Sequence, residues 1–291
     1  MVEAGQRASA VADLISVIVT TYQRPDALSA VLRSLERQSD RGFEIVVADD
    51  GSGPPTAEII ARWRPRLGVP LRHVWHEDRG FRAAEIRNRA ILASRGAYCI
   101  FLDGDCLARA KFVAAHRQLA ERGWFVTGHR VLLSKGLTEA VLRDGLAPEQ
   151  WTMRDWIGRR LSGGLNRLGP LLALPLGPLR KLQPLAWRRA RSSNLAIWRA
   201  DLDQVDGLDA NFVGWGREDS DLLVRLMRAG VRRKDGGFAT GVIHLWHPEA
   251  DRSALTKNDN RIETVLNSGR IKAERGLSEL RGDSVSGPGG T

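Results

Sequence analysis

The sequence predicts an α/β fold, in which a mixed, mainly parallel sheet is flanked by helices within a single domain that carries a helical insertion. Apolar runs of strand length lie at residues 14–22, 43–49 and 98–103, and each ends in polar or acidic residues. Segments with helical spacing of apolar residues separate these runs. Such strand–helix alternation is typical of a parallel sheet with right-handed crossovers. Ligands bind at the carboxyl ends of the strands in such sheets, so we expect a site there.

Length and composition are consistent with one large domain and a sizeable core. The chain has 291 residues, of which 43% are hydrophobic, and a formal net charge of +10. A basic balance favours a polyanionic partner such as nucleic acid, an anionic membrane surface or a phosphorylated substrate. Cys99 and Cys106 show no metal-ligand spacing and no disulfide framework, which favours a reducing, cytoplasmic compartment. No segment approaches the roughly 20 uninterrupted apolar residues of a membrane span, so a soluble or peripheral protein is expected.

The first elements alternate regularly. Residues 1–13 are small and polar and are expected to be disordered. The strand at 14–22 leads into a helix with apolar residues at positions 28, 31, 32 and 35, and the second strand ends in Asp49-Asp50-Gly51-Ser52 before a helix at 56–63. A short strand follows at 71–75. We therefore expect polar side chains from successive strands at one edge of the sheet.

A basic helix follows at about residues 82–91. Helical spacing puts Arg82 and Arg89 on one face, where they are expected to point at the carboxyl edge of the sheet while Arg87 faces elsewhere. A planar guanidinium can pair with phosphate oxygens in bidentate fashion. The alternative is a solvated basic helix face, and the pattern leaves both open.

The central motif is Asp103-Gly104-Asp105, which ends the apolar strand beginning at Tyr98. Carboxylates at the end of a buried strand suit a hard divalent cation such as Mg²⁺ or Mn²⁺, which also retains positions for phosphate and water. A simple turn is the alternative, because Asp and Gly are both turn formers. Other parts of the chain have to decide between these interpretations.

Residues 137–190 interrupt the alternation and are interpreted as a helical insertion. They follow a helix at 111–122 and a strand at 124–128, and are rich in Leu, Arg, Gly and Pro. One interpretation is a basic amphipathic surface on anionic lipid. The other is an ordinary lid or helical subdomain, which the helix-breaking prolines and glycines favour.

The last informative region combines aromatic, acidic and imidazole groups. A strand is expected at 192–198, and a Gly-Trp-Gly loop at 214–216 precedes Glu218, Asp219 and a helix that Gly230 closes. Indole rings stack on sugars and carboxylates bind hydroxyls, although acids also occur at helix starts for dipole reasons alone. A strand from 242 ends with His244 and His247, which can supply a nitrogen ligand to a metal. Residues 251–291 are predicted to form a C-terminal helix and a tail that is disordered at 281–291.

Taken in order, these motifs resemble the family 2 glycosyltransferases with a Rossmann-like GT-A fold. The sequences at 16–22, 47–52, 87–91 and 102–105 are similar to the nucleotide-sugar-binding half, placed here at 14–136. The sequence Phe-Val-Gly-Trp-Gly-Arg-Glu-Asp-Ser-Asp-Leu at 212–222 is similar to the acceptor half of β-1,4-galactosyltransferases and chondroitin-type polymerases, placed here at 191–250. Arg217 and Ser220 depart from that pattern, so donor and acceptor preferences do not follow from it.

The resemblance implies roles for particular residues. Asp50 would bind the nucleotide base, and Asp105 would be the main metal ligand, assisted by His244 or His247, with His244 favoured for its strand position. Asp219 would be the catalytic base, with Glu218 beside it. The implied donor-binding residues are Thr20, Tyr22, Asp50, Arg82, Asn88, Asp103 and Gly104; the acceptor-binding residues are Trp215, Gly216 and Glu218; and the metal ligands are Asp105, Asp103, His244 and His247.

The function expected is that of a metal-dependent, inverting glycosyltransferase using Mn²⁺ or Mg²⁺. Neutralising a diphosphate leaving group and deprotonating an acceptor hydroxyl are the two tasks of such transfer. A single displacement from the opposite face inverts the anomeric centre. The expected donor is of the UDP-galactose or UDP-N-acetylgalactosamine type. The expected acceptor is a glycan or lipid-linked sugar, with peripheral contact at the inner face of the plasma membrane.

Two other classes of protein share some of these features. A sugar-nucleotide nucleotidyltransferase would have a Gly-rich loop and an activating lysine near the first strand, where this chain has Thr20-Thr21-Tyr22-Gln23. A nucleic-acid-binding protein is suggested by the charge alone, but the basic residues are dispersed and form no recognition motif. No nucleic-acid partner is therefore expected.

Overall fold

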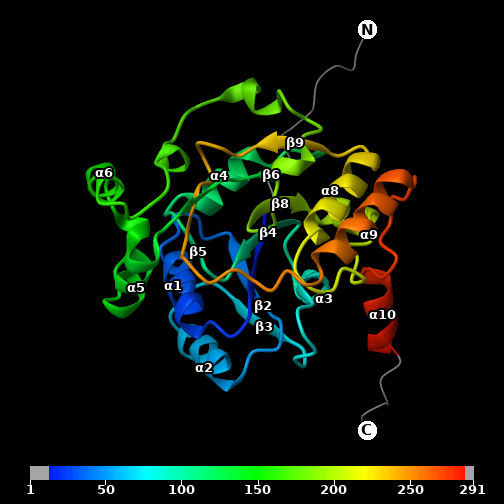
Figure 1. The fold of residues 1–291 in the computed structure, drawn as a ribbon, viewed down its shortest axis with the longest axis horizontal. Coiled ribbons are helices and arrows are strands. Elements are labelled where there is room, and N and C mark those ends of the chain that lie inside the picture. Colours follow the sequence, from blue (N-terminus) through cyan, green and yellow to red (C-terminus); the bar gives the residue numbers. More distant parts are fainter. Residues whose placement is uncertain (1–12, 286–291) are drawn as a thin grey trace.

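A computed structural model describes residues 13–285 of the chain (Figure 1). The disorder expected for residues 1–12 and 286–291 concerns parts outside the described residues. Residues 281–285 were also expected to be disordered, and there the expectation is wrong, because they complete helix α10 (Leu277–Val285).

A seven-stranded sheet forms the centre of the molecule, and its strand order is β3-β2-β1-β4-β8-β6-β9. The first four strands of this order are mutually parallel, whereas β8 is antiparallel to both of its neighbours. The strands are β1 (Ile15–Thr21), β2 (Phe43–Asp49), β3 (Leu71–Trp75), β4 (Tyr98–Asp103), β6 (Trp124–Thr127), β8 (Asn194–Trp198) and β9 (Arg232–Asp235). The predicted mixed, mainly parallel α/β fold is confirmed.

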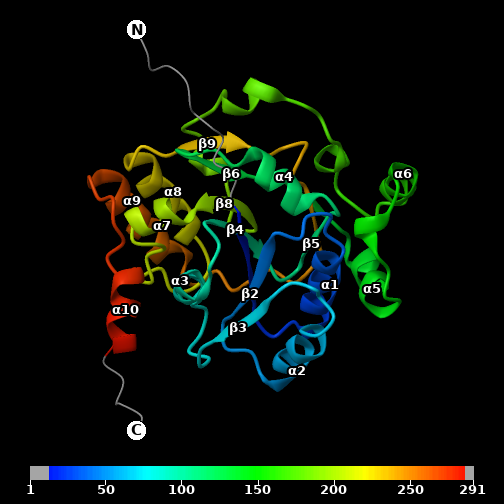
Figure 2. The same cartoon turned by 180° about the vertical axis from the view of Figure 1, so that it is seen from behind.

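Helices cover both faces of this sheet, as Figures 1 and 2 show from opposite sides. Alternate strand residues enter separate cores: Val17 and Ile100 face one, while Ile18 and Phe101 face the other. One core is covered by α1 (Pro25–Glu36), α2 (Pro54–Trp63) and α4 (Phe112–Leu119); the other by α3 (Ala83–Ala93), α7 (Arg199–Gln204) and α8 (Glu218–Arg228). Helix α9 (Leu255–Asn267) packs on α8, and α10 packs on α3. Burial on both faces explains why these strands read as nearly continuous apolar runs.

A second, three-stranded sheet joins distant parts of the chain. It consists of β5 (Cys106–Ala108), β10 (Val242–His244) and β7 (Arg130–Leu132), in that order. Strand β10 runs antiparallel to β5, with His244 opposite Cys106. The backbone N–H of Leu245 also donates to the carbonyl of Asp105 at 2.9 Å. The strand end carrying the histidines is therefore fixed beside the end of the central acidic motif.

The segment expected to be a helical insertion is helical only in its first part. Helices α5 (Lys135–Arg143) and α6 (Met153–Leu161) are followed by short 3₁₀ turns at Gly169–Leu171, Gly177–Lys181 and Trp187–Arg189. Prolines stand in the first two of these turns, where they fix the backbone and remove an N–H donor. Within residues 13–285, none of the helices is both long and apolar enough to cross a bilayer.

Candidate active site

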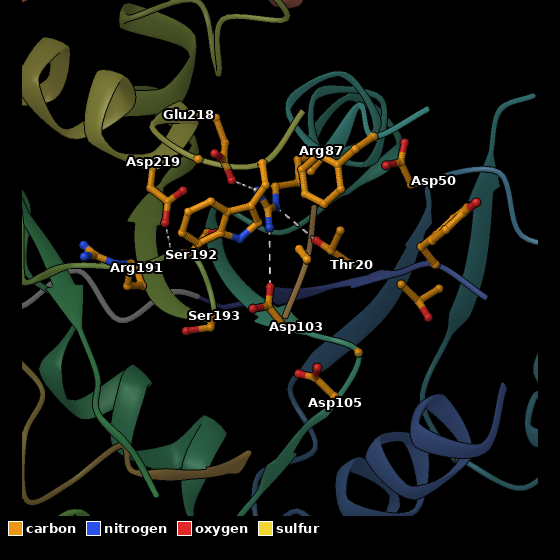
Figure 3. A pocket seen from close by; sticks show the side chains of 18 of the residues that line it. Thr20, Asp50, Arg87, Asp103, Asp105, Arg191, Ser192, Ser193, Glu218 and Asp219 are labelled. Carbon is orange, nitrogen blue, oxygen red and sulfur yellow. Dashed lines mark hydrogen bonds and ion pairs between the residues drawn. The ribbon is translucent and has the colours of Figure 1, made fainter. Parts of the chain in front are cut away.

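The parallel register brings the polar strand ends together. Thr20 at the end of β1 is paired with Asp103 at the end of β4, and Thr21 is paired with Asp49 of β2. A pocket of about 440 Å³ opens at this edge. Its lining includes Thr20, Tyr22, Asp50, Asp103, Gly104 and Asp105 from the first half of the chain and Ser192, Trp215, Gly216, Glu218, Asp219 and His247 from the second half. Figure 3 shows many of these side chains converging on it.

Arg87 is the central cation of this pocket, and the expectation that it faces elsewhere is wrong. Its guanidinium is 5% exposed and bonds Thr20 Oγ1 at 3.1 Å, Glu218 Oε1 at 3.1 Å and Asp103 Oδ1 at 3.4 Å (Figure 3). The sequence contained a signal for this position. Ala83, Ala90 and other small or apolar residues form the buried stripe of α3, and Arg87 falls within that stripe.

The other candidates on α3 have different partners. The Arg82 guanidinium bonds Glu85, Arg89 also pairs with Glu85, and neither residue lines the pocket. The Asn88 amide donates to the carbonyl of Leu208 and accepts from its N–H, which makes Asn88 a link between α3 and the 208 loop. The donor-binding roles of Arg82 and Asn88 stay predictions.

Asp50 and Tyr22 lie on one side of the pocket. Asp50 is buried, and its oxygens contact His76 Nε2 at 2.6 Å and accept the backbone N–H of Arg82 at 2.9 Å. Arg82 therefore reaches the site through its main chain. Tyr22 is 47% exposed, and its hydroxyl donates to Asp78. A fixed carboxylate beside an exposed ring can bind and stack on a nucleotide base.

The glycine between the two aspartates is required by close packing. A Cβ at Gly104 would lie 2.8 Å from the carbonyl oxygen of Thr20, and the Gly104 N–H donates to the same oxygen at 2.7 Å. Main chain therefore packs directly against main chain at this point. The packing holds Asp103 and Asp105 at fixed positions on either side of the turn.

Asp105 lies between two histidines. His244 Nε2 is 3.6 Å from one of its carboxylate oxygens, and His247 Nε2 is 3.4 Å from the other. Nδ1 of His247 lies 2.6 Å from the carbonyl of Pro248, which can only accept a hydrogen bond, so Nδ1 carries a proton and Nε2 is the nitrogen that faces Asp105. Burial lowers the pKa of His244 to about 4, against the opposing effect of Asp105, so its imidazole is neutral and able to bind a metal.

These donors fit a divalent cation. One carboxylate and two imidazole nitrogens suit Mn²⁺ and other transition-metal ions. The Cys106 thiol lies close to Asp105 and His244, and burial raises its pKa well above the ordinary value, which keeps it a neutral thiol. Asp103 differs from Asp105, because it is turned to Arg87; burial raises its pKa to about 6, although Arg87 opposes the shift.

The Gly-Trp-Gly loop has a backbone that favours glycine. Gly214, Gly216 and Arg217 have φ angles of +81°, +105° and +78°. Arg217 therefore has a left-handed backbone conformation. The galactosyltransferases that this segment resembles often have glycine at this position, and glycine adopts such a conformation without strain. Its guanidinium pairs with Asp259 at 2.5 Å. The loop leaves the Trp215 ring 38% exposed in the wall of the pocket.

Glu218 and Asp219 open helix α8 and differ in their surroundings. Burial raises the pKa of Glu218 to about 8, and the neighbouring Asp219 adds to this shift while Arg87 opposes it. Asp219 accepts the backbone N–H of Ser192 at 2.9 Å. Glu218 therefore keeps its proton near neutral pH. Asp221 is turned away from the pocket, because it is fully buried in an ion pair with Arg225.

Sequence reasoning missed several pocket residues. Arg130 lies close enough to Asp103 and His244 to lower the pKa of both groups, although burial dominates each shift. Arg191 and Ser193 line the pocket beside Ser192. These residues come from loops and short strands with no periodic pattern, so only the folded arrangement identifies them.

The fold and this pocket define a GT-A glycosyltransferase that uses nucleotide-sugar donors. Residues 16–167 match glycosyl transferase family 2, and residues 182–247 match the N-terminal domain of galactosyltransferase. The chain belongs to glycosyl transferase family 2. This membership selects the glycosyltransferase over the nucleotidyltransferase and nucleic-acid-binding alternatives.

Relatives and solved structures agree with this assignment. Validoxylamine A glucosyltransferase of Streptomyces hygroscopicus subsp. jinggangensis is 30% identical over 94% of this chain and 70% of that protein. The hyaluronan synthase of Pasteurella multocida is 27% identical over 74% of this chain and only 23% of that protein. S. aureus TarS 1-349 in complex with UDP has a TM-score of 0.57 at 17% identity, with 91% of this chain and 68% of that chain covered. The mannosyltransferase PcManGT from Pyrobaculum calidifontis, in complex with GDP-Man and Mn²⁺, has a TM-score of 0.54 at 17% identity, with 97% and 80% covered.

Proposed function

We propose that the protein is a metal-dependent, inverting glycosyltransferase in which Asp219 is the catalytic base. The observation that carries this proposal is the convergence of Asp219 and Asp105 on one pocket, one held by a backbone N–H and the other set between two imidazoles. Sugar transfer needs a base at the acceptor and positive charge at the leaving diphosphate. The two acidic groups meet these separate needs.

The donor would bind at the carboxyl ends of β1, β2 and β4. Asp50 accepts hydrogen bonds from the base, Tyr22 stacks on its face and Thr20 lines the same wall. Asp103 binds the ribose, held in place by Arg87. Arg130 lies near the acidic motif and contributes positive charge toward the diphosphate.

The metal ligands in this proposal are Asp105, His244 and His247. A bound Mn²⁺ or Mg²⁺ supplies Lewis-acid stabilisation of the negative charge on the leaving diphosphate. The protein holds the ligands ready through the pairing of β5 with β10, and the contact of His247 with the Pro248 carbonyl orients its ring. Mn²⁺ is favoured over Mg²⁺ because two of the three donors are nitrogen. The PcManGT structure was obtained with Mn²⁺.

The acceptor would lie over Trp215 and Gly216, with its hydroxyl at Asp219. Glu218 retains its proton and can donate to Asp219 or to the acceptor, which keeps a second negative charge out of the site. Asp219 accepts the hydroxyl proton as the acceptor oxygen attacks C1 of the donor sugar, and the bond from C1 to the diphosphate oxygen breaks. Attack from the face opposite the leaving group inverts the anomeric centre.

The finer assignments belong to this proposal as well. The donor is of the UDP-galactose or UDP-N-acetylgalactosamine type, and UDP is the nucleotide in the TarS complex. The acceptor is a hydroxyl of a glycan or lipid-linked sugar. A cytoplasmic location with peripheral contact at an anionic membrane completes the proposal.

Calorimetric titration tests the donor and metal assignments together. UDP, GDP and dTDP are titrated into the wild-type protein with and without Mn²⁺, and then into Asp105→Ala. We expect UDP to bind in the presence of Mn²⁺ and the substitution to weaken this binding by about 10- to 100-fold.

Asp144→Ala is the matched control, because Asp144 is an exposed acid paired with Arg143. It should bind UDP like the wild type. Equal UDP affinity with and without Mn²⁺, or unchanged affinity in Asp105→Ala, would contradict the proposed metal site.

A further inference from the structure

The segment from Ile157 to Leu185 exposes an unusual amount of apolar surface. Seven of the sixteen large hydrophobic side chains exposed in the described part of the chain lie in this short segment, although it is only about a tenth of the sequence. They are Ile157, Leu161, Leu172, Leu174, Leu179, Leu182 and Leu185, with exposed fractions from 40% to 84%. Clusters of this kind mark interaction surfaces, whereas single exposed leucines do not.

Polar contacts fix this segment from beneath. Arg180 is 5% exposed and donates to the carbonyls of Leu174, Asp235 and Gly237. The N–H of Leu174 donates to the carbonyl of Phe238 at 2.9 Å. An arginine is therefore turned inward while the neighbouring leucines are turned outward. This reverses the usual distribution at a protein surface, and it is built into the fold.

The charge of the same segment has one sign. No aspartate or glutamate occurs from residue 156 to residue 200. Exposed arginines are interspersed with the leucines, namely Arg159, Arg160 and Arg167, and exposed Arg188 follows the segment directly. A twofold contact between two copies would place this positive surface against itself, which like-charge repulsion disfavours. An apolar layer with an anionic surface is the complementary partner.

We propose that the 157–185 segment is a membrane-docking surface that binds anionic phospholipid bilayers. Leucine side chains would enter the boundary between headgroups and acyl chains, roughly 5–10 Å deep. The arginines would remain at the level of the headgroups, where each strengthens binding by about fivefold. Figures 1 and 2 show the segment running from α6 along the outer edge of the molecule toward β9.

The docking surface continues directly into the active-site wall. Arg191 follows Leu185 by six positions in the sequence, so the two Cα atoms lie within about 20 Å of each other even for an extended chain. Arg191, Ser192 and Ser193 line the pocket, and Ser192 holds Asp219. If the proposed function is correct, as this step assumes, docking brings the pocket to the headgroup of a lipid-linked acceptor.

Vesicle sedimentation tests the docking surface without any assay of activity. The wild-type protein is mixed with phosphatidylcholine vesicles that contain either no phosphatidylglycerol or 30% phosphatidylglycerol. We expect binding to the anionic vesicles at least about tenfold tighter than to the neutral ones, decreasing as salt rises. The triple variant Leu179→Ser, Leu182→Ser, Leu185→Ser should weaken binding by about tenfold or more.

Matched controls separate docking from folding, charge and catalysis. Leu266→Ser with Ile271→Ser removes two exposed apolar side chains outside the segment and should bind vesicles like the wild type. Arg159→Gln with Arg160→Gln should weaken binding only to anionic vesicles. UDP titration of the triple variant should match the wild type, so a failure of the proposed function is seen separately.

Three results would overturn the docking proposal. They are wild-type protein that does not bind anionic vesicles, a triple variant that binds as well as the wild type, and a concentration-dependent dimer that the triple variant abolishes. The third result would identify the surface as an interface between two copies of the chain.

Discussion

Two acidic pairs share the pocket, and their surroundings separate them. Asp103 and Asp105 follow a buried strand, and Asp105 lies between two imidazoles that can bind a metal. Glu218 and Asp219 begin a helix, where burial raises the pKa of the first and a backbone N–H holds the second. In the proposed function, the same carboxyl chemistry serves charge neutralisation in one pair and proton transfer in the other. The neighbours of each carboxylate, more than its spacing in the sequence, determine this difference.

The sharpest test of the comparison is Asp219→Asn. The amide retains the shape and can still accept the Ser192 N–H, but it has no basicity toward an acceptor hydroxyl. We expect kcat to fall by about 10²- to 10⁴-fold while metal-dependent UDP affinity stays within about twofold of the wild type. Turnover assays and calorimetry on the same protein measure the two effects. A loss of UDP binding would place Asp219 in the donor site and remove the distinction between the pairs.

Arg87→Lys tests the contact between the two acidic pairs, because Arg87 bonds Asp103 of one pair and Glu218 of the other. Only a planar guanidinium can bond Thr20, Asp103 and Glu218 at once, and an ammonium group reaches fewer of them. We expect kcat/KM to fall by about 10²-fold, with both UDP affinity and turnover affected. Arg89→Lys is the control, because Arg89 pairs with Glu85 outside the pocket, and it should change kcat/KM by less than about twofold. Equal effects of the two substitutions would mean that Arg87 contributes no more than surface charge.

Gly104→Ala changes the backbone between Asp103 and Asp105 and leaves Glu218 and Asp219 as they are. A Cβ 2.8 Å from the Thr20 carbonyl has to displace backbone, which we expect to cost about 1–3 kcal/mol of unfolding free energy and to weaken metal-dependent UDP binding. Denaturant unfolding and calorimetry measure these effects. Gly136→Ala is the control, because Gly136 lies in helix α5 with open space around it, and this substitution should stabilise the protein by about 0.5–1 kcal/mol. Equal stability changes in the two variants would contradict the packing argument.

Glu218→Gln tests whether Glu218 carries a proton in the folded protein. The folded pKa of about 8 lies above the ordinary value of 4.5, so the folded state binds the proton more tightly than the unfolded state. Stability from this group is therefore complete below about pH 4.5 and is lost as pH rises through about 8. The glutamine variant lacks this loss, so its Tm relative to that of the wild type should rise by about 2–4 °C between pH 6 and pH 9. A constant difference in Tm across this range would show that Glu218 is ionised in the folded protein.

Arg217→Gly has the smallest expected effect. Glycine relieves a φ of +78°, but the substitution removes the half-exposed ion pair with Asp259. The two changes oppose each other, so the unfolding free energy should change by less than about 1 kcal/mol. Denaturant unfolding measures this, and Arg217→Ala, which retains the strain and loses the pair, should be less stable than Arg217→Gly. The reverse order would mean that the ion pair outweighs the backbone conformation.

The positions of the strands could be predicted from the sequence more accurately than the directions of the arginine side chains. Strand ends such as Thr20, Asp50 and Asp103 could be predicted to meet because parallel strands share a direction, and a buried apolar run marks each strand. Arg87 is predicted on the wrong face when Arg82, which precedes α3, and Arg87 and Arg89, which lie in it, are compared only with one another. Their relation to the small residues of the helix, Ala83 and Ala90 among them, would have placed Arg87 in the buried stripe.

Other parts of the site have no local signal. Asn88 belongs to a motif that carries the resemblance to the family, but its amide binds the main chain of Leu208, a contact that only the fold reveals. Arg130 comes from a three-residue strand whose pairing with β10 is visible only in three dimensions. Residues 162–190 form no α-helix, and their glycines and prolines predict this because both residue types break helices. The contacts of Arg180 with three carbonyls could not be predicted from the sequence.

The three-stranded sheet also has a consequence for how the protein is made. During synthesis Asp105 leaves the ribosome long before His244, and the pairing of β5 with β10 must close the long intervening chain. A nascent chain that ends before β10 therefore has the acidic motif without its imidazole partners. Since a ligand that binds only the closed form stabilises it by mass action, cation binding would favour the completed molecule over its fragments. In the proposed function, the set of metal ligands is therefore complete only once β10 has paired with β5.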